Sequence, residues 1–444
     1  MLTLTDKKEW EKKQSKKIER ELPFFITIVS LLAASGFGPY TIFQKMKDVG
    51  LLPTIQKESI KILKRIDMLG TDPLTALSEA KERPSSRALG EFLGGYVSAI
   101  QSGGNVINYL KSKMESAFER FENLEKQSVE KIAGLVHGWL TMQIVVLAVF
   151  ILMAAIGSYP MSGSGDTGSS TPPYEILLFA PIMSIIFMKL VQGMTTSNIK
   201  ELETKKIIKF TVPIILVGTI LILTHMFDNM GLNPYILGGA LTAASIFPAL
   251  QFKKIYTLNM DAELATPQIL RDITEARKAG MGPEKCIIHA CKRKDFKSFN
   301  VIANSIANKL EWGVSLNTMF NTLQNEVKNF QVLIAFRILF EIITSGGGNV
   351  NTLDSLADTS EKIYDIQKNK RESLRVYVIV GYMLIIVTGF TTLMTIDSFV
   401  SINQEKSLGK PVSNEASFKS LMDLVSIAVI AQAWLAGLFI GRVT

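Results

Sequence analysis

The residues best suited to metal or redox chemistry are two cysteines and a histidine that share one short segment. This segment reads Cys286-Ile-Ile-His289-Ala-Cys291, and the chain has no other cysteine. At about 100° per residue, a helix places Cys286 and His289 on one face, whereas Cys291 points roughly 140° away from Cys286. An unbroken helix therefore cannot bring all three side chains to one metal ion, and we predict no metal site. Two cysteines without a CxxC pair also exclude a disulfide framework.

Glycines that could bind a nucleotide phosphate occur at Gly163, Gly165 and Gly168, in the pattern GxGxxG. They lie in SGSGDTGSSTPP, with no predicted strand before them and no helix after, whereas a dinucleotide site requires both. The chain lacks a GxxxxGK phosphate loop followed by Ser or Thr, and it lacks GxSxG and HExxH. His137 and His225 lie beside or within apolar segments, where a structural role is the usual one. We therefore predict no catalytic residue, no cofactor and no nucleotide hydrolysis.

Two glycine motifs occur twice in the chain at the same spacing. Segments 22–152 and 266–396 align without a gap at a constant offset of 244 residues. The matched positions are Gly36, Gly38, Pro39, Gly103, Gly104 and Asn105 in the first copy, and Gly280, Gly282, Pro283, Gly347, Gly348 and Asn349 in the second. Identical separation of two motifs indicates an internal duplication. We assign these residues to structural turns, in which glycines end helices and each asparagine caps the next helix.

The periodicity of apolar residues is helical throughout both copies. No segment alternates with period two for long enough to predict a strand. Each copy is therefore predicted to form a bundle of about six helices, whose last helix continues into the membrane, and the fold class is all-α. Residues 7–20 and 23–34 look like the charged and apolar parts of a signal peptide. Their match to an amphipathic helix of the second copy instead makes 23–34 the first helix of a bundle.

Six apolar segments are long enough to cross a membrane, which takes about 20 residues. They are 139–157, 176–193, 207–227, 234–252, 376–396 and 421–441. Lys189 falls inside the second segment, so the sequence leaves open whether this one crosses fully. Membrane spans combined with polar bundles explain a mean hydropathy of +0.24 in a chain with 20% charged residues.

Positive charge is distributed unevenly among the segments that connect the spans. Nearly all of the 48 Lys and Arg residues lie in 1–138, 194–206 and 253–375, whereas 397–420 contains only Lys406, Lys410 and Lys419. By the positive-inside rule, both termini and both long segments are cytoplasmic. The net charge of +8 is then mainly a consequence of topology, and it requires no nucleic-acid partner.

The sequence thus predicts a polytopic membrane protein with two homologous cytoplasmic bundles and about six transmembrane helices. The expected parts are a basic N-terminal segment (1–21), the first bundle (22–138), four spans (139–252), the second bundle (253–375), and two spans with an external loop (376–444). Residues 7–20 and 292–297 are dense in lysine. Such segments are typical of solvated helix faces and, alternatively, of surfaces that bind an acidic partner or anionic membrane lipid.

Four segments carry a resemblance to a known family. ELPFFITIVSLLAASGFGP and ALGEFLGGYVSAIQSGGNV, with their counterparts ATPQILRDITEARKAGMGP and VLIAFRILFEIITSGGGNV, resemble the type II secretion F family. These are the platform proteins of type IV pilus-like machines. The four predicted middle spans, where the bacterial pattern has two, make the archaeal branch, with the archaellum assembly platform, the closer match.

The resemblance implies a non-enzymatic scaffold of the cytoplasmic membrane. Such a scaffold couples a hexameric cytoplasmic secretion ATPase to the insertion of pilin-like or archaellin subunits into a filament, and it works as a homo-oligomer, expected to be a dimer. By analogy, the candidate ATPase contacts are Lys292, Arg293, Lys294 and Lys297. Which filament is assembled stays open. The alternative is a membrane transporter or channel with large cytoplasmic domains, which would be expected to place charges near mid-membrane in repeats of opposite orientation.

Overall fold

The structure, a computed structural model, describes most of the chain. The described residues are 4–82, 84–157, 175–194, 233–293, 295–346, 348–406 and 415–443. The predicted span 207–227, the glycine-rich segment 162–173, His225, Lys294 and Gly347 lie outside them. Every regular element in the described ranges is a helix, which confirms the predicted all-α class.

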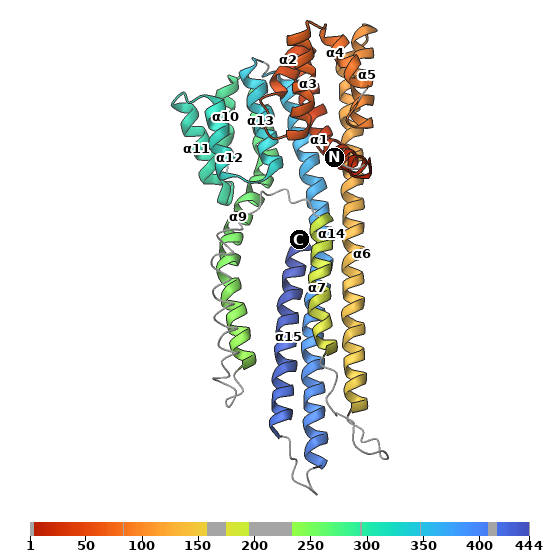
Figure 1. Cartoon of the computed structure of the whole chain (residues 1–444). Coiled ribbons are helices and arrows are strands. Elements are labelled where there is room, and N and C mark those ends of the chain that lie inside the picture. Colours follow the sequence, from red (N-terminus) through yellow and green to blue (C-terminus); the bar gives the residue numbers. More distant parts are fainter. Residues whose placement is uncertain are drawn as a thin grey trace. The chain divides into compact units, whose positions relative to one another are not determined.

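From α1 to α6 and from α9 to α14 the helices follow one another through short connections, and α6, α9 and α14 are unusually long (Figure 1). The helices of the first copy are α1 (Leu4–Ala34), α2 (Pro39–Met46), α3 (Pro53–Leu69), α4 (Pro73–Glu82), α5 (Arg87–Gln101) and α6 (Val106–Gly157). Next come α7 (Glu175–Met194) and α9 (Asn233–Lys278), and then the second copy's α10 (Pro283–Arg293), η2 (Lys297–Phe299), α11 (Asn300–Glu311), α12 (Leu316–Glu326), α13 (Phe330–Thr344) and α14 (Val350–Lys406). The last helix is α15 (Glu415–Val443).

The helix boundaries repeat with the sequence. Both α2 and α10 begin at a proline that follows a Gly-x-Gly turn, Pro39 in the first copy and Pro283 in the second. The ring fixes φ near −65° and lacks the N–H that a first-turn residue leaves unpaired, so proline suits this position. Likewise α6 begins at Val106 and α14 at Val350, which keeps the offset of 244 residues.

The chain divides into two compact units. The first, which we call the bundle unit, contains the described residues of 1–125 and 255–367. The second, the apolar unit, contains the described residues of 126–194, 233–254 and 368–443. Helices α6, α9 and α14 each contribute residues to both units without a break in the helix. The parts of the two copies that precede residues 126 and 368 therefore share one compact unit.

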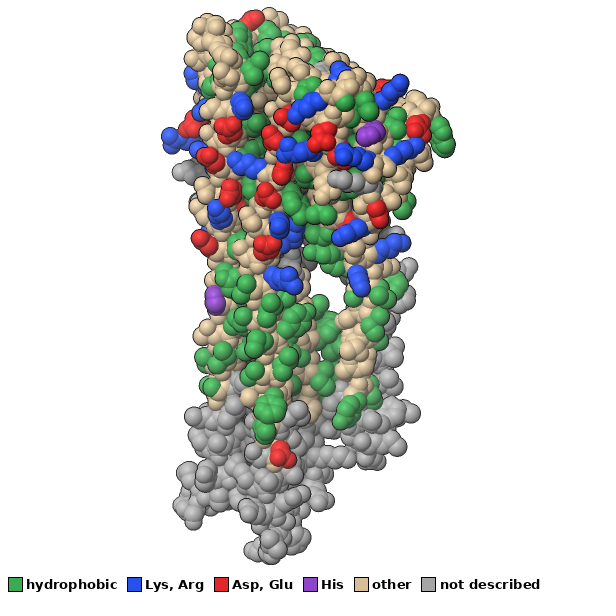
Figure 2. Space-filling view, turned by 180° about the vertical axis from the view of Figure 1, so that it is seen from behind, with side chains coloured by type: hydrophobic (Ala, Val, Ile, Leu, Met, Phe, Trp, Pro, Cys, Tyr) green, Lys and Arg blue, Asp and Glu red, His purple; other side chains and the backbone are tan. Residues whose placement is uncertain are grey.

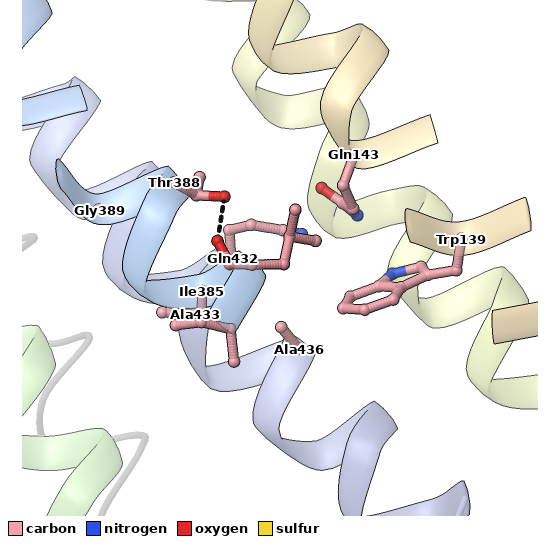
Figure 3. Close-up of a pocket in the computed structure, with 9 residues that line it drawn as sticks. Trp139, Gln143, Ile385, Thr388, Gly389, Gln432, Ala433 and Ala436 are labelled. Carbon is pink, nitrogen blue, oxygen red and sulfur yellow. Dashed lines mark hydrogen bonds between the residues drawn. The ribbon is translucent and has the colours of Figure 1, made fainter. Parts of the chain in front are cut away.

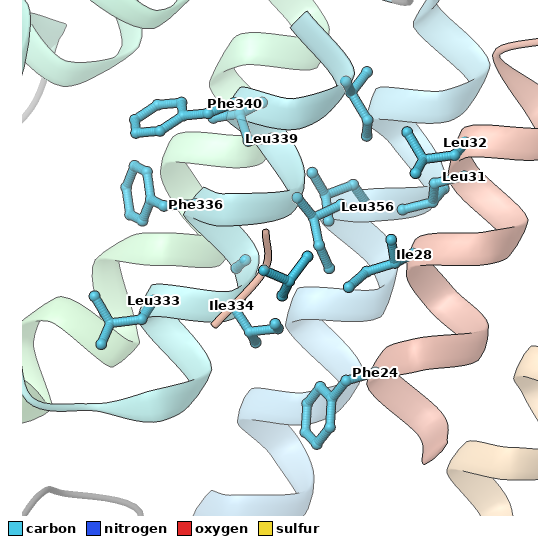
Figure 4. Close-up of a cluster of buried hydrophobic side chains, with 14 of the residues drawn as sticks. Phe24, Ile28, Leu31, Leu32, Leu333, Ile334, Phe336, Leu339, Phe340 and Leu356 are labelled. Carbon is cyan, nitrogen blue, oxygen red and sulfur yellow. The ribbon is translucent and has the colours of Figure 1, made fainter. Parts of the chain in front are cut away.

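The core of the bundle unit mixes side chains from both copies (Figure 4). On α1, Phe24, Ile28 and Leu32 are buried, and they lie with Ile334 and Leu356 of the second copy. The ring centroids of Phe24 and Phe330 are 5.1 Å apart in an edge-to-face arrangement. Each fully buried aliphatic or aromatic side chain stabilises the fold by about 1.5–3 kcal/mol. The apolar face of α1 is therefore held by the second copy as well as by its own.

The apolar unit exposes hydrophobic side chains instead of burying them. Two described helical segments, Tyr235–Lys278 and Val350–Thr391, are long and apolar enough to cross a membrane, and the most apolar 18-residue stretch of each has a mean hydropathy of 1.4 and 1.8, respectively. Only 11% of the most apolar stretch of each is buried. Figure 2 shows charged side chains gathered on the bundle unit and mostly hydrophobic ones on the apolar unit. Exposed apolar surface of this extent requires lipid or another partner to cover it.

The other predicted spans fall on helices of the apolar unit or outside the described residues. Segment 176–193 lies within α7, whose 20 residues correspond to about 30 Å of helix, the thickness of a hydrocarbon core. Shorter apolar helical segments are Ile182–Gln192 and Val429–Gly441. The number of six spans stays a prediction.

Candidate functional site

The basic segment of the second copy lies at the end of α10, and two of its cations are engaged in ion pairs. Lys292 Nζ lies 2.6 Å from Glu311 Oε1, and Arg293 Nη1 lies 2.8 Å from Asp272 Oδ1. The Lys292 pair is solvent-exposed and is worth at most about 1 kcal/mol. Asp272 is almost completely buried, so Arg293 neutralises a carboxylate of α9 and supports the fold.

Lys297 is the candidate contact that remains available. Its side chain is exposed and forms no ion pair with any residue that the structure describes. The backbone is held in a left-handed conformation with φ of +53°, and the Lys297 N–H donates to Asp295 Oδ1 at 3.0 Å. This turn leads into η2, of which Lys297 is the first residue. Lys294 lies between the described ranges.

A residue that sequence reasoning missed lies next to this basic segment. Trp312 directly follows Glu311, the partner of Lys292, and is 81% exposed. The repeat could have revealed it, because Trp312 aligns with Met68, another large apolar residue at a helix end. The periodicity of apolar residues predicts which face of a helix is buried. It does not predict whether a residue at the end of that helix is covered by a neighbouring helix, so Trp312 was missed.

The cysteines and His289 lie on α10, which does not bring them together. Cys286 and Cys291 are buried, whereas His289 is exposed. Burial raises the pKa of the Cys291 thiol to about 12 and also raises the pKa of Cys286. Both thiols are therefore neutral near pH 7 and unreactive. In the part of the chain that the structure describes, no group of three or more His, Cys, Asp or Glu residues could hold a metal ion.

The described glycines and asparagines of the predicted turns lie between helices in both copies. Gly36 and Gly280 have φ of +90° and +87°, a conformation that side chains with a Cβ rarely adopt. Asn105 Oδ1 accepts from the Asn108 N–H at 3.0 Å, and Asn349 Oδ1 accepts from the Asn351 N–H at 3.3 Å. These bonds satisfy N–H groups in the first turns of α6 and α14. Gly38, Gly103, Gly104, Gly282 and Gly348 occupy the same two turns, whereas Pro39 and Pro283 are the first residues of α2 and α10.

Carboxylates of the first helix in each copy stabilise the start of the third helix. Glu21 on α1 accepts from the N–H groups of Thr54 and Ile55 at 3.0 and 2.8 Å. In the second copy, Asp261 on α9 accepts from the N–H of Ser298, the residue equivalent to Thr54, at 3.1 Å. Asp261 comes one helical turn earlier than the position equivalent to Glu21. The two copies thus use the same contact from neighbouring turns of the first helix.

An ion-pair cluster joins the two copies. Lys45 Nζ on α2 lies 2.6 Å from Glu341 Oε1 on α13, and Arg337 Nη2 lies 3.4 Å from Glu341 Oε2. Arg337 also donates to the backbone carbonyl of Asp48 at 3.4 Å. All three charged side chains are mostly buried, so the cluster is a specific contact between copies.

The apolar unit contains a small polar cluster around Ser184 of α7. The side-chain N–H groups of Trp139, Gln143 and Gln432 donate to Ser184 Oγ at 3.0, 3.0 and 3.2 Å. Beside the cluster is a cavity of about 20 Å³, and Figure 3 shows Trp139, Gln143, Ala436 and Gln432 around it. Such a cavity is the size of one water molecule and too small for a substrate. The three hydrogen bonds to Ser184 join α6, α7 and α15.

Comparison with known proteins identifies the repeat. The family described as "Type II secretion system (T2SS), protein F" matches residues 25–156 and 269–396. The matched regions begin 244 residues apart, the offset of the internal repeat. An uncharacterized protein of Methanocaldococcus jannaschii is 21% identical over 400 residues, covering 83% of this chain and 67% of that protein. No solved structure matches the chain.

The family's two matched regions carry the features described above. They contain the glycine turns, the helices of both copies, and the starts of the long helices α6 and α14. Together they cover more than half of the chain. The protein therefore belongs to the type II secretion system protein F family, as the sequence resemblance indicated.

Proposed function

We propose that this protein is the membrane platform of a type IV pilus-like assembly machine, building an archaellum, a pilus or a secretion pseudopilus. It couples a cytoplasmic secretion ATPase to the insertion of pilin-like or archaellin subunits into a filament. Membership in the family supports the general role of a membrane platform. We add that the protein couples ATP hydrolysis by the ATPase to the insertion of subunits.

The observation that supports coupling is the continuity of the long helices. α6 has 52 residues and α14 has 57, which correspond to about 80 Å of uninterrupted helix each. Both begin in the bundle unit and continue through the apolar unit. A continuous helix transmits a tilt or rotation between its ends, whereas a flexible linker absorbs it.

The proposed topology follows from the charge distribution. The bundle unit is cytoplasmic, both termini are cytoplasmic, and about six helices of 139–252 and 376–444 cross the cell membrane. The extensive apolar surface of the described spans supports contact with membrane lipid. We expect a homo-oligomer, a dimer in the simplest case, which acts without enzymatic activity of its own.

We propose that the ATPase binds at Lys292, Arg293, Lys294 and Lys297. The ion pairs of Lys292 and Arg293 within the protein determine which of these residues can be substituted to test the contact. Reversing Arg293 would place a carboxylate beside the buried Asp272 and destabilise the bundle unit, so it cannot report on docking alone. Among the residues that the structure describes, Lys297 has no such partner, and Lys297→Glu therefore isolates the charge effect.

The test uses the full chain in lipid nanodiscs and the purified secretion ATPase of the same organism. We expect the unchanged chain to bind the ATPase and stimulate its ATP hydrolysis, and Lys297→Glu to weaken binding about threefold to tenfold at low salt. Lys285→Glu is the matched control, because Lys285 is an exposed lysine at the other end of α10. Absence of binding by the unchanged chain would contradict the proposed coupling, whereas equal binding by both variants would contradict only this contact.

A further inference from the structure

Three N–H groups in the apolar unit share the hydroxyl oxygen of Ser184. They belong to Trp139, Gln143 and Gln432, at 3.0, 3.0 and 3.2 Å. A hydroxyl oxygen has only two lone pairs, so three donors cannot all form a full hydrogen bond with it. The indole of Trp139 can only donate, whereas a glutamine amide can turn about its last bond and present its oxygen to the hydroxyl instead. One of the two amides therefore depends on a further partner.

Gln432 is the amide that has a polar atom without a partner. Its side chain is only 8% exposed, and its Oε1 has no hydrogen-bond partner among the residues that the structure describes. An amide oxygen buried in this way is unfavourable, because it has lost its hydrogen bonds to water. Turning the amide brings Oε1 to the Ser184 hydroxyl, but it directs the two amide N–H donors to the place that the oxygen leaves. In either orientation, Ser184 satisfies only one end of the amide.

Space for one water molecule lies beside this amide. The cavity of about 20 Å³ is lined by Gln432 of α15, Gln143 of α6 and Thr388 of α14, together with apolar side chains (Figure 3). A water molecule needs about 10–15 Å³ and two to four polar partners, and three polar side chains line this cavity. A water can donate to an amide oxygen or accept from an amide N–H, so it suits either orientation of Gln432.

Thr388 supplies a polar group on the α14 side of the cavity. Its hydroxyl donates to the backbone carbonyl of Leu384 at 2.8 Å, so its oxygen faces a water as an acceptor. No carboxylate is among the side chains that line the cavity, whereas Mg²⁺ or Ca²⁺ requires six or more oxygen ligands. A lipid chain or another organic molecule is too large for this volume. The size and the chemistry of the cavity both favour water.

We propose that the cavity binds one water molecule, which hydrogen-bonds to the Gln432 amide and to the Thr388 hydroxyl and so links α15 to α14. Because Gln432 also bonds to Ser184, this water extends the polar cluster of α6, α7 and α15 to a fourth helix. All four helical segments belong to the apolar unit. The water site does not depend on the platform function proposed above.

A structure of the full chain in lipid nanodiscs, at a resolution that shows ordered water, tests the site directly. We expect one density peak at about 2.7–3.2 Å from both the Gln432 amide and the Thr388 hydroxyl. A cavity without such density, or one filled by a neighbouring side chain, would overturn the proposal.

Thr388→Val tests the link to α14, because valine keeps the shape of threonine and removes the hydroxyl. Thr391→Val is the matched control. The Thr391 hydroxyl likewise donates to the carbonyl four residues earlier, that of Val387 at 2.9 Å, but Thr391 does not line the cavity. The difference between the two variants therefore isolates the contact with the water.

We expect the density to disappear in Thr388→Val and to remain in Thr391→Val. We also expect the folding equilibrium constant, measured by denaturant unfolding, to be about fivefold lower for Thr388→Val than for Thr391→Val. If the density remains in both variants and their stabilities are equal, Thr388 does not bind the water and the proposed link between α15 and α14 is wrong.

Discussion

Two opposing effects act on the pKa of the Glu21 carboxyl. Burial raises the pKa of this carboxyl above its usual 4.5, although the N–H bonds from Ile55 and Thr54 act in the opposite direction. A raised pKa means that the folded protein disfavours the ionised form relative to the unfolded chain. The stabilisation linked to the protonated form is fully present below pH 4.5 and is lost as the pH rises through the folded value.

This sign gives a prediction for Glu21→Gln. The amide is neutral at every pH and its oxygen still accepts an N–H of α3, so we expect the bundle unit to be at least as stable as the unchanged protein at pH 7. Below pH 4 the advantage should disappear, because Glu21 is then protonated as well. Thermal unfolding midpoints of the full chain between pH 4 and 7 measure it.

Glu21→Ala distinguishes the contribution of the hydrogen bonds that Glu21 accepts at the start of α3 from the contribution of its charge. It removes the acceptor at the start of α3 and should cost about 1 kcal/mol below pH 4, and less at pH 7, where ionisation of Glu21 already lowers the stability of the unchanged protein. A Glu21→Gln variant that is as destabilised as Glu21→Ala at pH 7 would mean that the ionised carboxylate is required.

At the same scale, the sequence predicted residues whose role is local and missed those whose partners are distant. Asn105 and Gly36 act within a few residues of themselves, so their types and spacing suffice to predict a cap and a turn. The pairing of Arg293 with Asp272 crosses from α10 to α9, and no periodicity predicts it. For that reason the basic segment looked like four equivalent contact residues, whereas the structure distinguishes Lys297 from Lys292 and Arg293.

At the scale of elements, the main finding is that the two copies pack together. The sequence predicted the helices of each copy, because apolar stripes and glycine turns are local signals. It could not predict that the face of α1 packs against the second copy, since a stripe shows which face is buried but not what buries it. The contact of Phe24 with Phe330 and the pair of Lys45 with Glu341 are both between copies.

We predict that replacing Lys45 and replacing Glu341 lower the stability of the bundle unit by different amounts. Lys45→Ala leaves Glu341 beside Arg337 and should cost about 1 kcal/mol. Glu341→Ala leaves both Lys45 and Arg337 without their carboxylate in a mostly buried site and should cost about 2–3 kcal/mol. Denaturant unfolding of the full chain, followed by a probe in the bundle unit, measures both.

The pair of Lys61 and Glu58 is the matched control, because Lys61 is 65% exposed. Lys61→Ala should change stability by less than about 0.5 kcal/mol. The double variant Lys45→Ala with Glu341→Ala should be less destabilised than the sum of its single variants. Equal losses for Lys45→Ala and Glu341→Ala would show that Arg337 does not share the carboxylate.

At the scale of the whole molecule, composition and architecture agree. The chain is 47% hydrophobic and 20% charged, and the structure separates these residues into an apolar unit and a charged bundle unit. At the boundaries between the units that the structure describes, the chain is helical, since α6, α9 and α14 run through them without a turn. If the platform works by transmitting a movement, the boundary positions of these helices must be stiff.

Lys368 and Asn369 test this stiffness, because both are exposed on α14 directly after the boundary at Gln367. Replacing both by glycine should cost about 1 kcal/mol each in helix stability and introduce a local hinge, while leaving the bundle unit folded and able to bind the ATPase. We expect filament assembly in cells to fall several-fold with unchanged protein abundance. Replacing both by alanine keeps the helix stiff while removing the same side chains, so the alanine variant should assemble filaments normally. Normal assembly by the glycine variant would exclude α14 as the transmitting element, and loss of assembly in both variants would assign the effect to the Lys368 and Asn369 side chains.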